Sequence, residues 1–267
     1  MPEFPHILAQ NRLEQAGSVS FTDGSGNPLA ENGIYPLAHL TDRSRGSLWK
    51  GAAGKSEQRL TWNFDSAVEM DTFVLDRNFT LEGASATVYF QHSADGASWT
   101  TAVTVSALES GSIYWRTFSA VSRQFWRLRI TGLTAQPRIY NLWAGKRIEL
   151  TFGPYGDFDP YEEEVVGEPV HGASGAFQWN QRFRRRVLRA AFENLTDSHY
   201  ELLELWWNQA PGEGRNWWWL TFPQSEPEDP LYLNCEGAPR RFAIARTVRY
   251  GMIEAREVNS PWCTKSW

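Results

Sequence analysis

Apolar and polar residues alternate along the chain from about residue 58 to residue 146. Leu60, Trp62 and Phe64 stand at every second position, and turn-forming residues fill positions 93–96 between two such runs. Successive side chains of a strand point to opposite faces, so a period of two sends one set of side chains into a core and the other outward. Short alternating runs separated by turn residues predict an antiparallel β-sandwich or barrel.

The segment Ser93 to Trp99 has a local reason to form a hairpin turn. The side chains of Ser93 and Asp95 can accept hydrogen bonds from the backbone amides that follow them. Gly96 can adopt the positive φ that closes such a turn. We therefore expect one strand to end before this segment and Trp99 to begin the next.

A later run, residues 125–130, reads Phe-Trp-Arg-Leu-Arg-Ile. Arg127 and Arg129 alternate with apolar side chains, so one face of this strand is expected to be polar and the other buried.

The order of these features over residues 10–148 resembles that of discoidin-like domains, the coagulation-factor C-type domains with a galactose-binding-like jelly roll. The elements that carry the resemblance are, in chain order, Asp42 and Trp49, Trp62 to Asp65, Ser93 to Trp99, Phe125 to Ile130, and Ile139 to Gly145. The resemblance implies a jelly-roll β-sandwich as the first domain, residues 1–148.

Discoidin-like domains that bind ligands do so with loops at one end of the barrel. The matching segments here are Leu40 to Gly51 and Arg77 to Gly83. Polar and stacking contacts with a sugar could come from five residues of these segments: Asp42, Arg43, Trp49, Arg77 and Asn78. The alternative is that Asp42 and Trp49 only brace their loop.

A domain boundary is expected between residues 149 and 175. This segment is rich in turn formers and contains the acidic run Glu162 to Glu164, which is typical of a linker or a long loop. Asp157, Asp159 and Glu162 invite a calcium hypothesis, but their spacing is not that of an EF-hand loop. A solvated acidic loop is the better interpretation, and we expect no metal site.

Residues 149–258 predict an α+β domain, a sheet or barrel with one helix. Ser198 and Glu201 fit a capping box at the start of a helix with a broad apolar stripe, which ends at the break from Asn208 to Gly214. Strands are expected around this helix at residues 178–192, 216–222, 230–234, 240–249 and 251–258. The last residues, 259–267, are expected to form a frayed tail.

This second order of elements resembles minor tail and baseplate proteins of long-tailed bacteriophages, including distal tail proteins, whose sheet-plus-helix units stack into rings. The resemblance implies a ring-forming homo-oligomer, a hexamer first and a trimer second. It implies the tail tube, hub and tape-measure proteins as partners. It also implies a place in the tail of the virion after synthesis in the host cytoplasm. In many distal tail proteins the ring-forming domain comes first, whereas here it follows the discoidin-like domain.

The chain contains 14 tryptophans, and five of them cluster in the second domain. Three consecutive tryptophans on one strand must point to both of its faces. Either the outer face meets another subunit, or the strand is buried on both sides within its own domain. The candidate interface residues are Trp206, Trp207, Trp217, Trp218, Trp219, Arg184 and Arg186.

The basic run Arg182 to Arg186 is expected to form a solvated or subunit-facing strand. In a ring, its arginines could pair with the Glu162 to Glu164 run of a neighbouring subunit. A smaller possibility is that they line a tube through which DNA passes. The net charge of −5 argues against general nucleic-acid binding, and we expect no sequence-specific nucleic-acid partner.

No catalytic, metal or cofactor motif stands out. The nucleophile-elbow, metalloprotease, phosphate-loop and dinucleotide-binding motifs are absent, and the five histidines are scattered. Cys235 and Cys263 have neither metal nor redox spacing. The first residues lack the features of a secretory signal, and no stretch approaches a membrane span. We therefore expect no enzyme, no cofactor and no membrane partner.

Two non-enzymatic functions remain open. The first is a structural subunit of a phage tail tip or baseplate, in which the discoidin-like domain decorates a ring. The alternative is a carbohydrate-binding module that recognises a glycan of the host surface. The two functions can coexist in one chain.

Overall fold

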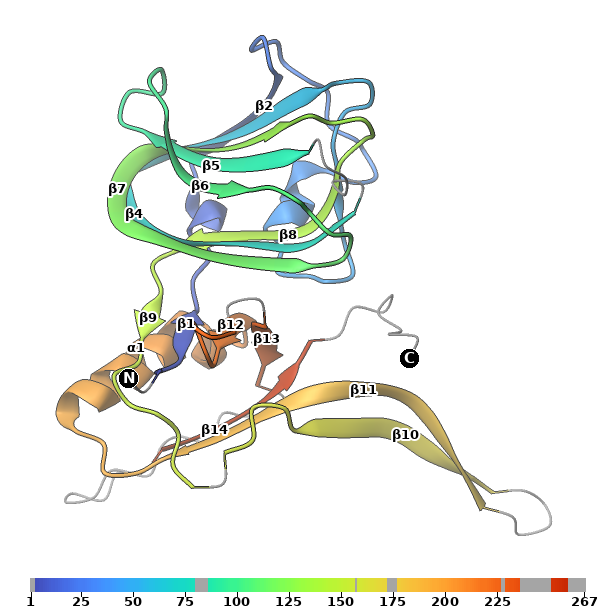
Figure 1. Ribbon diagram of the computed structural model, residues 1–267, viewed down its shortest axis with the longest axis vertical. Coiled ribbons are helices and arrows are strands. Elements are labelled where there is room, and N and C mark those ends of the chain that lie inside the picture. Colours follow the sequence, from blue (N-terminus) through green and yellow to red (C-terminus); the bar gives the residue numbers. More distant parts are fainter. Residues whose placement is uncertain are drawn as a thin grey trace. The chain divides into compact units, whose positions relative to one another are not determined.

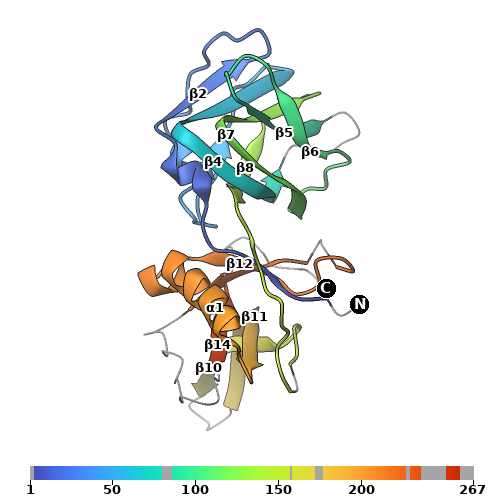
Figure 2. The same cartoon turned by 90° about the vertical axis from the view of Figure 1, so that its left-hand side faces the viewer.

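The computed structural model describes residues 3–79, 86–156, 158–171, 177–226, 229–235 and 251–258. The chain divides into two compact units, one made of Leu8–Arg147 with Ser225–Pro230, the other of Met1–Ile7 with Ile148–Gln224 and Leu231–Trp267 (Figure 2). Both units are built mainly from antiparallel strands, which confirms the expected mainly-β class.

The first unit is a β-sandwich whose two layers share two long strands, β4 (Glu57–Phe79) and β7 (Ile113–Thr131). Figure 1 shows both strands curving from the layer that holds β2 and β5 to the layer that holds β8. The register between β4 and β7 shifts between Asn63 and Val68, where the two strands bend.

We call the two layers the β5 layer and the β8 layer. The β5 layer consists of β2 (Ser18–Asp23), the first part of β4, the end of β7, β5 (Thr87–Ser93) and β6 (Thr100–Val105). The β8 layer consists of β3 (Trp49–Lys50), β8 (Arg138–Gly145), the last part of β4 and the start of β7. Two short 3-10 helices, Arg12–Gln15 and Leu37–Leu40, belong to the same unit.

Aromatic rings fill the space between the layers. Phe90 of β5 stacks on Phe73 at 4.7 Å and on Trp126 at 5.1 Å between ring centroids, and all three side chains are fully buried. Large aromatic side chains supply much of the burial that holds a core together. The inward positions Leu60, Trp62 and Trp126 follow the alternation of the sequence, which confirms the predicted strand faces.

The turn between β5 and β6 forms as predicted. The Ser93 hydroxyl oxygen accepts hydrogen bonds from the amides of Asp95 and Gly96 at 3.2 and 2.9 Å. The Asp95 carboxylate accepts from the amides of Ala97 and Ser98, both at 2.9 Å. Gly96 has a φ of +71°, in the left-handed region that favours glycine.

The second unit is a seven-stranded, mainly antiparallel sheet with one α-helix among the described residues. The strands lie in the order β10 (Glu163–His171), β11 (Phe177–Phe192), β14 (Gly251–Glu257), β13 (Leu231–Asn234), β12 (Trp217–Leu220), β1 (His6–Leu8) and β9 (Ile148–Glu149). The helix α1 spans Asp197–Gln209, and a short 3-10 helix follows at Pro211–Glu213. The predicted strand 240–249 and the predicted tail 259–267 lie outside the described residues.

Two local predictions in this unit were wrong. The capping box uses Thr196 and His199 rather than Ser198 and Glu201, because the Thr196 hydroxyl accepts from the His199 amide at 3.3 Å and starts the helix earlier. The segment expected to be a linker contains strand β10, which pairs with β11 along its whole length.

The tryptophan strand β12 is buried on both of its faces. Trp217, Trp218 and Trp219 have no exposed surface. On one face Trp217 meets Trp206 of α1 at 4.8 Å, and on the other Trp218 meets Tyr232 of β13 at 4.7 Å. These four tryptophans therefore form a core of the second unit. Of the two alternatives, the strand buried on both sides within its own domain is confirmed, and an outer face of β12 that meets another subunit is wrong. Trp207, half-buried, contacts Trp206 edge-on at 5.9 Å.

The arginines of β11 pair with acids of their own chain. Across the β10–β11 ladder Arg182 pairs with Glu168 at 2.6 Å, Arg184 with Glu163 at 3.5 Å and Arg185 with Glu164 at 3.0 Å. Arg186 pairs with Glu257 of β14 at 3.2 Å, and Arg189 pairs with Glu162. The partners that we assigned to a neighbouring subunit are thus supplied within the fold, because the hairpin register places the two charged runs opposite each other.

The described part of the chain contains no cluster of acidic side chains that would support the calcium hypothesis. Asp159 accepts a hydrogen bond from the amide of Tyr161, Glu162 pairs with Arg189, and Asp157 lies outside the described residues. No group of three or more His, Cys, Asp or Glu side chains suited to a metal occurs among the residues that the structure describes. Within the same residues, no helix has the length and apolarity to cross a membrane.

Candidate functional site

The loop residues predicted to bind a sugar hold their own loop together. The exposed Asp42 accepts hydrogen bonds from the Ser44 amide at 2.8 Å and the Ser47 hydroxyl at 2.5 Å. Arg43 donates to the Glu14 carboxylate at 2.5 and 3.0 Å and lies 4.9 Å over the ring of Trp143. Both side chains therefore have partners within the fold.

Trp49 cannot serve as the expected stacking surface in this conformation. Its side chain is completely buried and meets Phe21 edge-on at 5.7 Å. A sugar stacks on an open ring face, which Trp49 does not present, so it braces the loop. The backbones of Arg77 and Asn78 lie in β4, and their side chains are outside the described residues.

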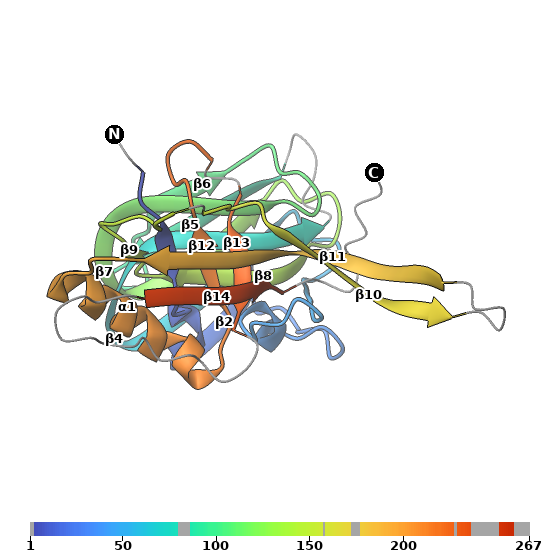
Figure 3. The same ribbon diagram turned by 90° about the horizontal axis from the view of Figure 1, so that it is seen from below.

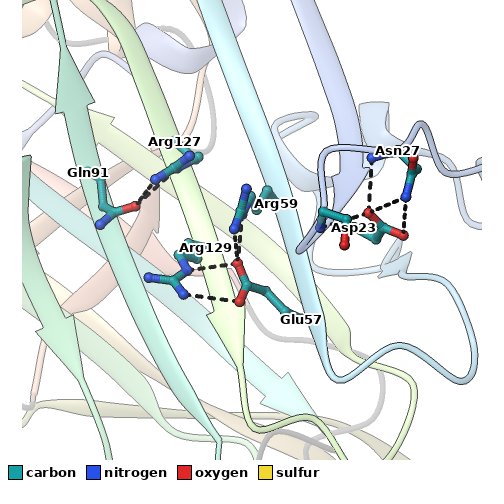
Figure 4. A network of polar contacts seen from close by, with 8 residues as sticks. Asp23, Asn27, Glu57, Arg59, Gln91, Arg127 and Arg129 are labelled. Atoms are coloured by element: carbon teal, nitrogen blue, oxygen red, sulfur yellow. Dashed lines mark hydrogen bonds and ion pairs between the residues drawn. The ribbon is translucent and has the colours of Figure 1, made fainter. Parts of the chain in front are cut away.

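A different cluster occupies the outer face of the β5 layer. The register places Arg59 of β4 opposite Arg129 of β7, and Arg129 opposite Tyr89 of β5. Two residues along, Arg127 lies opposite Gln91. Paired residues of an antiparallel ladder point to the same face, so the pairing of β4, β5 and β7 brings these side chains together. Figure 4 shows Arg59, Arg127, Arg129, Gln91 and Glu57 of this group. We call this set the arginine face: Glu57, Arg59, Tyr89, Gln91, Trp99, Arg127 and Arg129.

Glu57 holds two of the three arginines of this face. The Arg129 guanidinium donates to both Glu57 carboxylate oxygens, at 2.8 and 3.0 Å, and Arg59 donates to one of them at 2.6 Å. The hydrogen bond from Arg129, assisted by the one from Arg59, lowers the pKa of Glu57. In return, the bond to Glu57 raises the pKa of Arg129. The carboxylate is therefore ionised and fully engaged.

Arg127 is held by neutral groups instead. Its Nε and Nη2 donate to the Gln91 side-chain oxygen at 3.0 and 2.6 Å, and its guanidinium carbon lies 4.0 Å from the centre of the Trp99 ring. Gln91 is itself fixed by donating to the Thr101 hydroxyl at 3.0 Å. Burial, followed by the charges of Arg59 and Arg129, lowers the pKa of Arg127 to about 10. The guanidinium remains protonated at neutral pH, in a fixed orientation.

The electrostatics of the face differ from those of the whole chain. Three guanidinium groups and one carboxylate give the arginine face a net charge of +2, whereas the whole chain carries −5. The neighbouring Lys55 and Asp23 pair with each other at 3.1 Å and leave this balance unchanged. Tyr89 and Trp99 add ring surfaces beside Arg129 and Arg127. The arrangement suits a polar or anionic ligand with planar hydrogen-bonding groups.

The alternation of residues 125–130 predicted a polar face with Arg127 and Arg129, and the structure confirms it. Nothing in that pattern indicated Arg59, Glu57 or Gln91 as neighbours. Their assembly depends on which strands pair, and the paired residues, such as Gln91 and Arg127 or Arg59 and Arg129, are more than thirty positions apart in the sequence.

No family model matches the chain. No curated protein matches it either. Several solved structures do. Chitosan-binding module 1 of a chitosanase/glucanase from Paenibacillus sp. IK-5 is 19% identical over 51% of this chain and 98% of the module, with a TM-score of 0.40. Module 2 of that enzyme, solved with chitotriose, is 20% identical over 50% of this chain and 98% of the module, with a TM-score of 0.40. A putative alpha-L-fucosidase from Bacteroides thetaiotaomicron is 16% identical over 52% of this chain and 29% of that enzyme, with a TM-score of 0.42.

Proposed function

We propose that this chain is a non-enzymatic carbohydrate-binding protein and that the arginine face contacts the sugar. The observation that carries the proposal is the fixed orientation of Arg127 between Gln91 and the Trp99 ring. Sugars present pairs of hydroxyl groups and flat ring faces, which planar hydrogen-bonding groups and aromatic rings recognise together. Because the groups are already ordered by one another, little conformational freedom is lost when a ligand binds.

The absence of catalysis is part of the same proposal. A general acid for glycoside cleavage needs a carboxyl group whose pKa is raised toward neutrality. Glu57 is the carboxylate of the arginine face, and its pKa is lowered by Arg129 and Arg59. A carboxylate held in this way supports binding rather than proton transfer.

A glycan array with the full chain tests this function. We expect a restricted set of glycans to bind, and Trp99→Ala to remove most of the signal while the thermal midpoint stays close to that of the parent protein. Arg138→Gln is the matched control, because Arg138 is exposed on β8, in the other layer. Binding to no glycan at all, or equal binding by Trp99→Ala, would contradict the proposal.

A second candidate function is the structural subunit of a phage tail tip, located in the virion. The observation that favours it is the ribbon formed by β10 and β11, defined as residues 163–171 and 177–186. Within the described residues this part of β11 pairs only with β10, whereas residues 187–192 pair with β14. Figure 3 shows the ribbon reaching beyond β14. A two-stranded hairpin alone is marginally stable in water, so such a ribbon gains by packing on another subunit.

The ribbon also offers apolar side chains for that packing. Val165 and Phe183 are each 42% exposed. If the ribbon joins subunits into a ring, native mass spectrometry of the full chain gives a hexamer, or else a trimer, and Val165→Ser with Phe183→Ser shifts it to the monomer. Tyr155→Ser is the control, because Tyr155 is exposed in the same unit away from the ribbon. A parent protein that stays monomeric at high concentration and in purified virions rules this candidate out.

A further inference from the structure

We infer that the Arg127 side chain binds a carboxylate group of the ligand, so that the carbohydrate of the proposed function is an acidic one. This inference rests on the proposed function and specifies its ligand class. It starts from a comparison with four arginines of the sandwich unit that pair with carboxylates. Arg43 pairs with Glu14, Arg45 with Asp76, and Arg59 and Arg129 with Glu57.

Arg127 differs from these arginines. Among the described residues no carboxylate lies within ion-pair distance of it, although it is half-buried and has two positive neighbours, Arg59 and Arg129. The Glu57 carboxylate opposes their effect on Arg127 only in part, since it is bonded to both of them. Removing a charge from water without an opposite charge is costly. A ligand carboxylate would complete this environment, because it would give Arg127 the direct ion pair that Glu57 gives to Arg59 and Arg129.

The donor geometry of Arg127 fits a carboxylate. A guanidinium has five N–H donors in a rigid fork, and Gln91 accepts from Nε and from Nη2. Three N–H groups, two on Nη1 and one on Nη2, are accepted by no described residue, and one from each nitrogen lies along the edge formed by Nη1 and Nη2. Two parallel N–H donors at such an edge match the two oxygens of a carboxylate. Trp99 supports the guanidinium from one side, which holds the fork in place.

The surroundings of Arg127 favour a sugar acid over a nucleic acid. A phosphate backbone needs cations repeated along a strip, and the acidic chain as a whole repels it. Of the other arginines of the face, Arg59 and Arg129 are already paired with Glu57. One carboxylate at Arg127, with neighbouring hydroxyl groups beside the half-buried Tyr89, matches the groups that this face presents.

Titration calorimetry with the full chain tests the inference against a matched pair of ligands. One is an oligosaccharide of uronic acid units, and the other is the same oligosaccharide with its carboxylates methyl-esterified. We expect the acid to bind at least about tenfold more tightly than the ester, because a charged bidentate contact is lost on esterification. Added salt should weaken the binding of the acidic oligosaccharide and leave the binding of the ester unchanged.

Three variants assign the preference to Arg127. Arg127→Met should remove the preference for the acid, and Arg127→Lys should retain part of it, because lysine keeps the charge without the fork. Gln91→Glu supplies a carboxylate inside the fold, so it should remove the preference while keeping or raising the thermal midpoint. This variant keeps the test valid if Arg127→Met does not fold. Arg138→Met is the control, with an unchanged preference expected.

Each outcome has a distinct meaning. A preference for the acid that Gln91→Glu removes supports the inference. Equal binding of acid and ester overturns it and leaves the proposed carbohydrate function standing. Binding of neither oligosaccharide, together with an empty glycan array, overturns both. A single-stranded oligonucleotide that binds more tightly than the uronic acid oligosaccharide overturns the ligand class and points to phosphate recognition.

Discussion

The partners of a single side chain decide what that side chain does in this protein. Asp42, Arg43 and Trp49 have the chemistry of a sugar site, yet hydrogen bonds, an ion pair and burial commit them to the loop. Arg127 carries the same guanidinium group as Arg129. Arg129 forms an ion pair with the Glu57 carboxylate, whereas Arg127 donates to the neutral side chain of Gln91. Residue type indicates a range of roles, and the contacts select one of them.

Asp95 gives the first prediction at this scale. Backbone hydrogen bonds from Ser98 and Ala97, with one from the Ser93 hydroxyl, lower its pKa from 3.8 to about 2. Because the folded-state pKa is depressed, Asp95 stabilises the fold above its unfolded pKa, and this stabilisation is lost as the pH falls through the folded pKa. Asp95→Ala should therefore reduce the free energy of unfolding at pH 7 and flatten its decline between pH 4 and pH 2.

Urea denaturation of both proteins at several pH values measures this difference. Asp23, whose pKa is also lowered to about 2, is present in both proteins and cancels in the comparison. Parallel curves for the two proteins would show that the turn does not depend on the ionised carboxylate.

Gly96 gives the second prediction. Its φ of +71° disfavours any side chain, whereas the added methyl group would only touch the Phe125 ring at 3.4 Å. Gly96→Ala should therefore lower the free energy of unfolding by about 1 kcal/mol, mainly through backbone strain. Gly33→Ala is the control, because Gly33 has no left-handed φ and an added methyl group meets nothing within 4 Å. Equal effects of the two substitutions in chemical denaturation would contradict this explanation.

At the scale of elements, β12 leads to a prediction about stability. Trp218 packs on Tyr232 with no exposed surface. Trp218→Ala should destabilise the second unit by about 3–5 kcal/mol, as expected for truncating a buried aromatic side chain. It should leave the association state of the folded protein unchanged. Denaturation followed by native mass spectrometry measures both, and loss of assembly without loss of stability would restore the interface interpretation.

Elements whose signals are local were predictable from the sequence. The β5–β6 turn follows from Ser93, Asp95 and Gly96 alone, and the strand faces follow from alternation. The helix was found from its apolar stripe, although Thr196 starts it earlier than expected. Strand β10 was missed because its acidic residues resemble a solvated loop until the arginines of β11 lie opposite them.

Features that depend on distant pairing were not predictable in the same way. Alternation shows that a strand of three tryptophans has two faces, but not that α1 and β13 cover them. It likewise shows that Arg127 and Arg129 share a face, but not that β4 brings Glu57 and Arg59 beside them. The arginine face arises from this strand pairing. The resemblance to discoidin-like domains indicated loop residues instead, and therefore gave a different set of candidate residues.

At the scale of the whole molecule, the first unit contains its own core. The buried cluster between its layers runs from Leu13 to Ala144, and its aromatic centre is Phe73, Phe90 and Trp126. A unit that holds a complete hydrophobic core can fold without the rest of the chain. The only other segment grouped with it is Ser225–Pro230, which contributes no residue to that cluster among the described residues.

Residues 8–147 expressed alone should therefore fold into a β-sandwich with one cooperative unfolding transition. Far-ultraviolet circular dichroism and calorimetry check this, and the aromatic core should give a near-ultraviolet signal that disappears in the same transition. Trp126→Ala in the same segment should lower its stability by about 3–5 kcal/mol, because the ring is buried between Phe90 and the rest of the core. A gradual transition without a near-ultraviolet signal would show that the sandwich needs segment 225–230 or the second unit in order to fold.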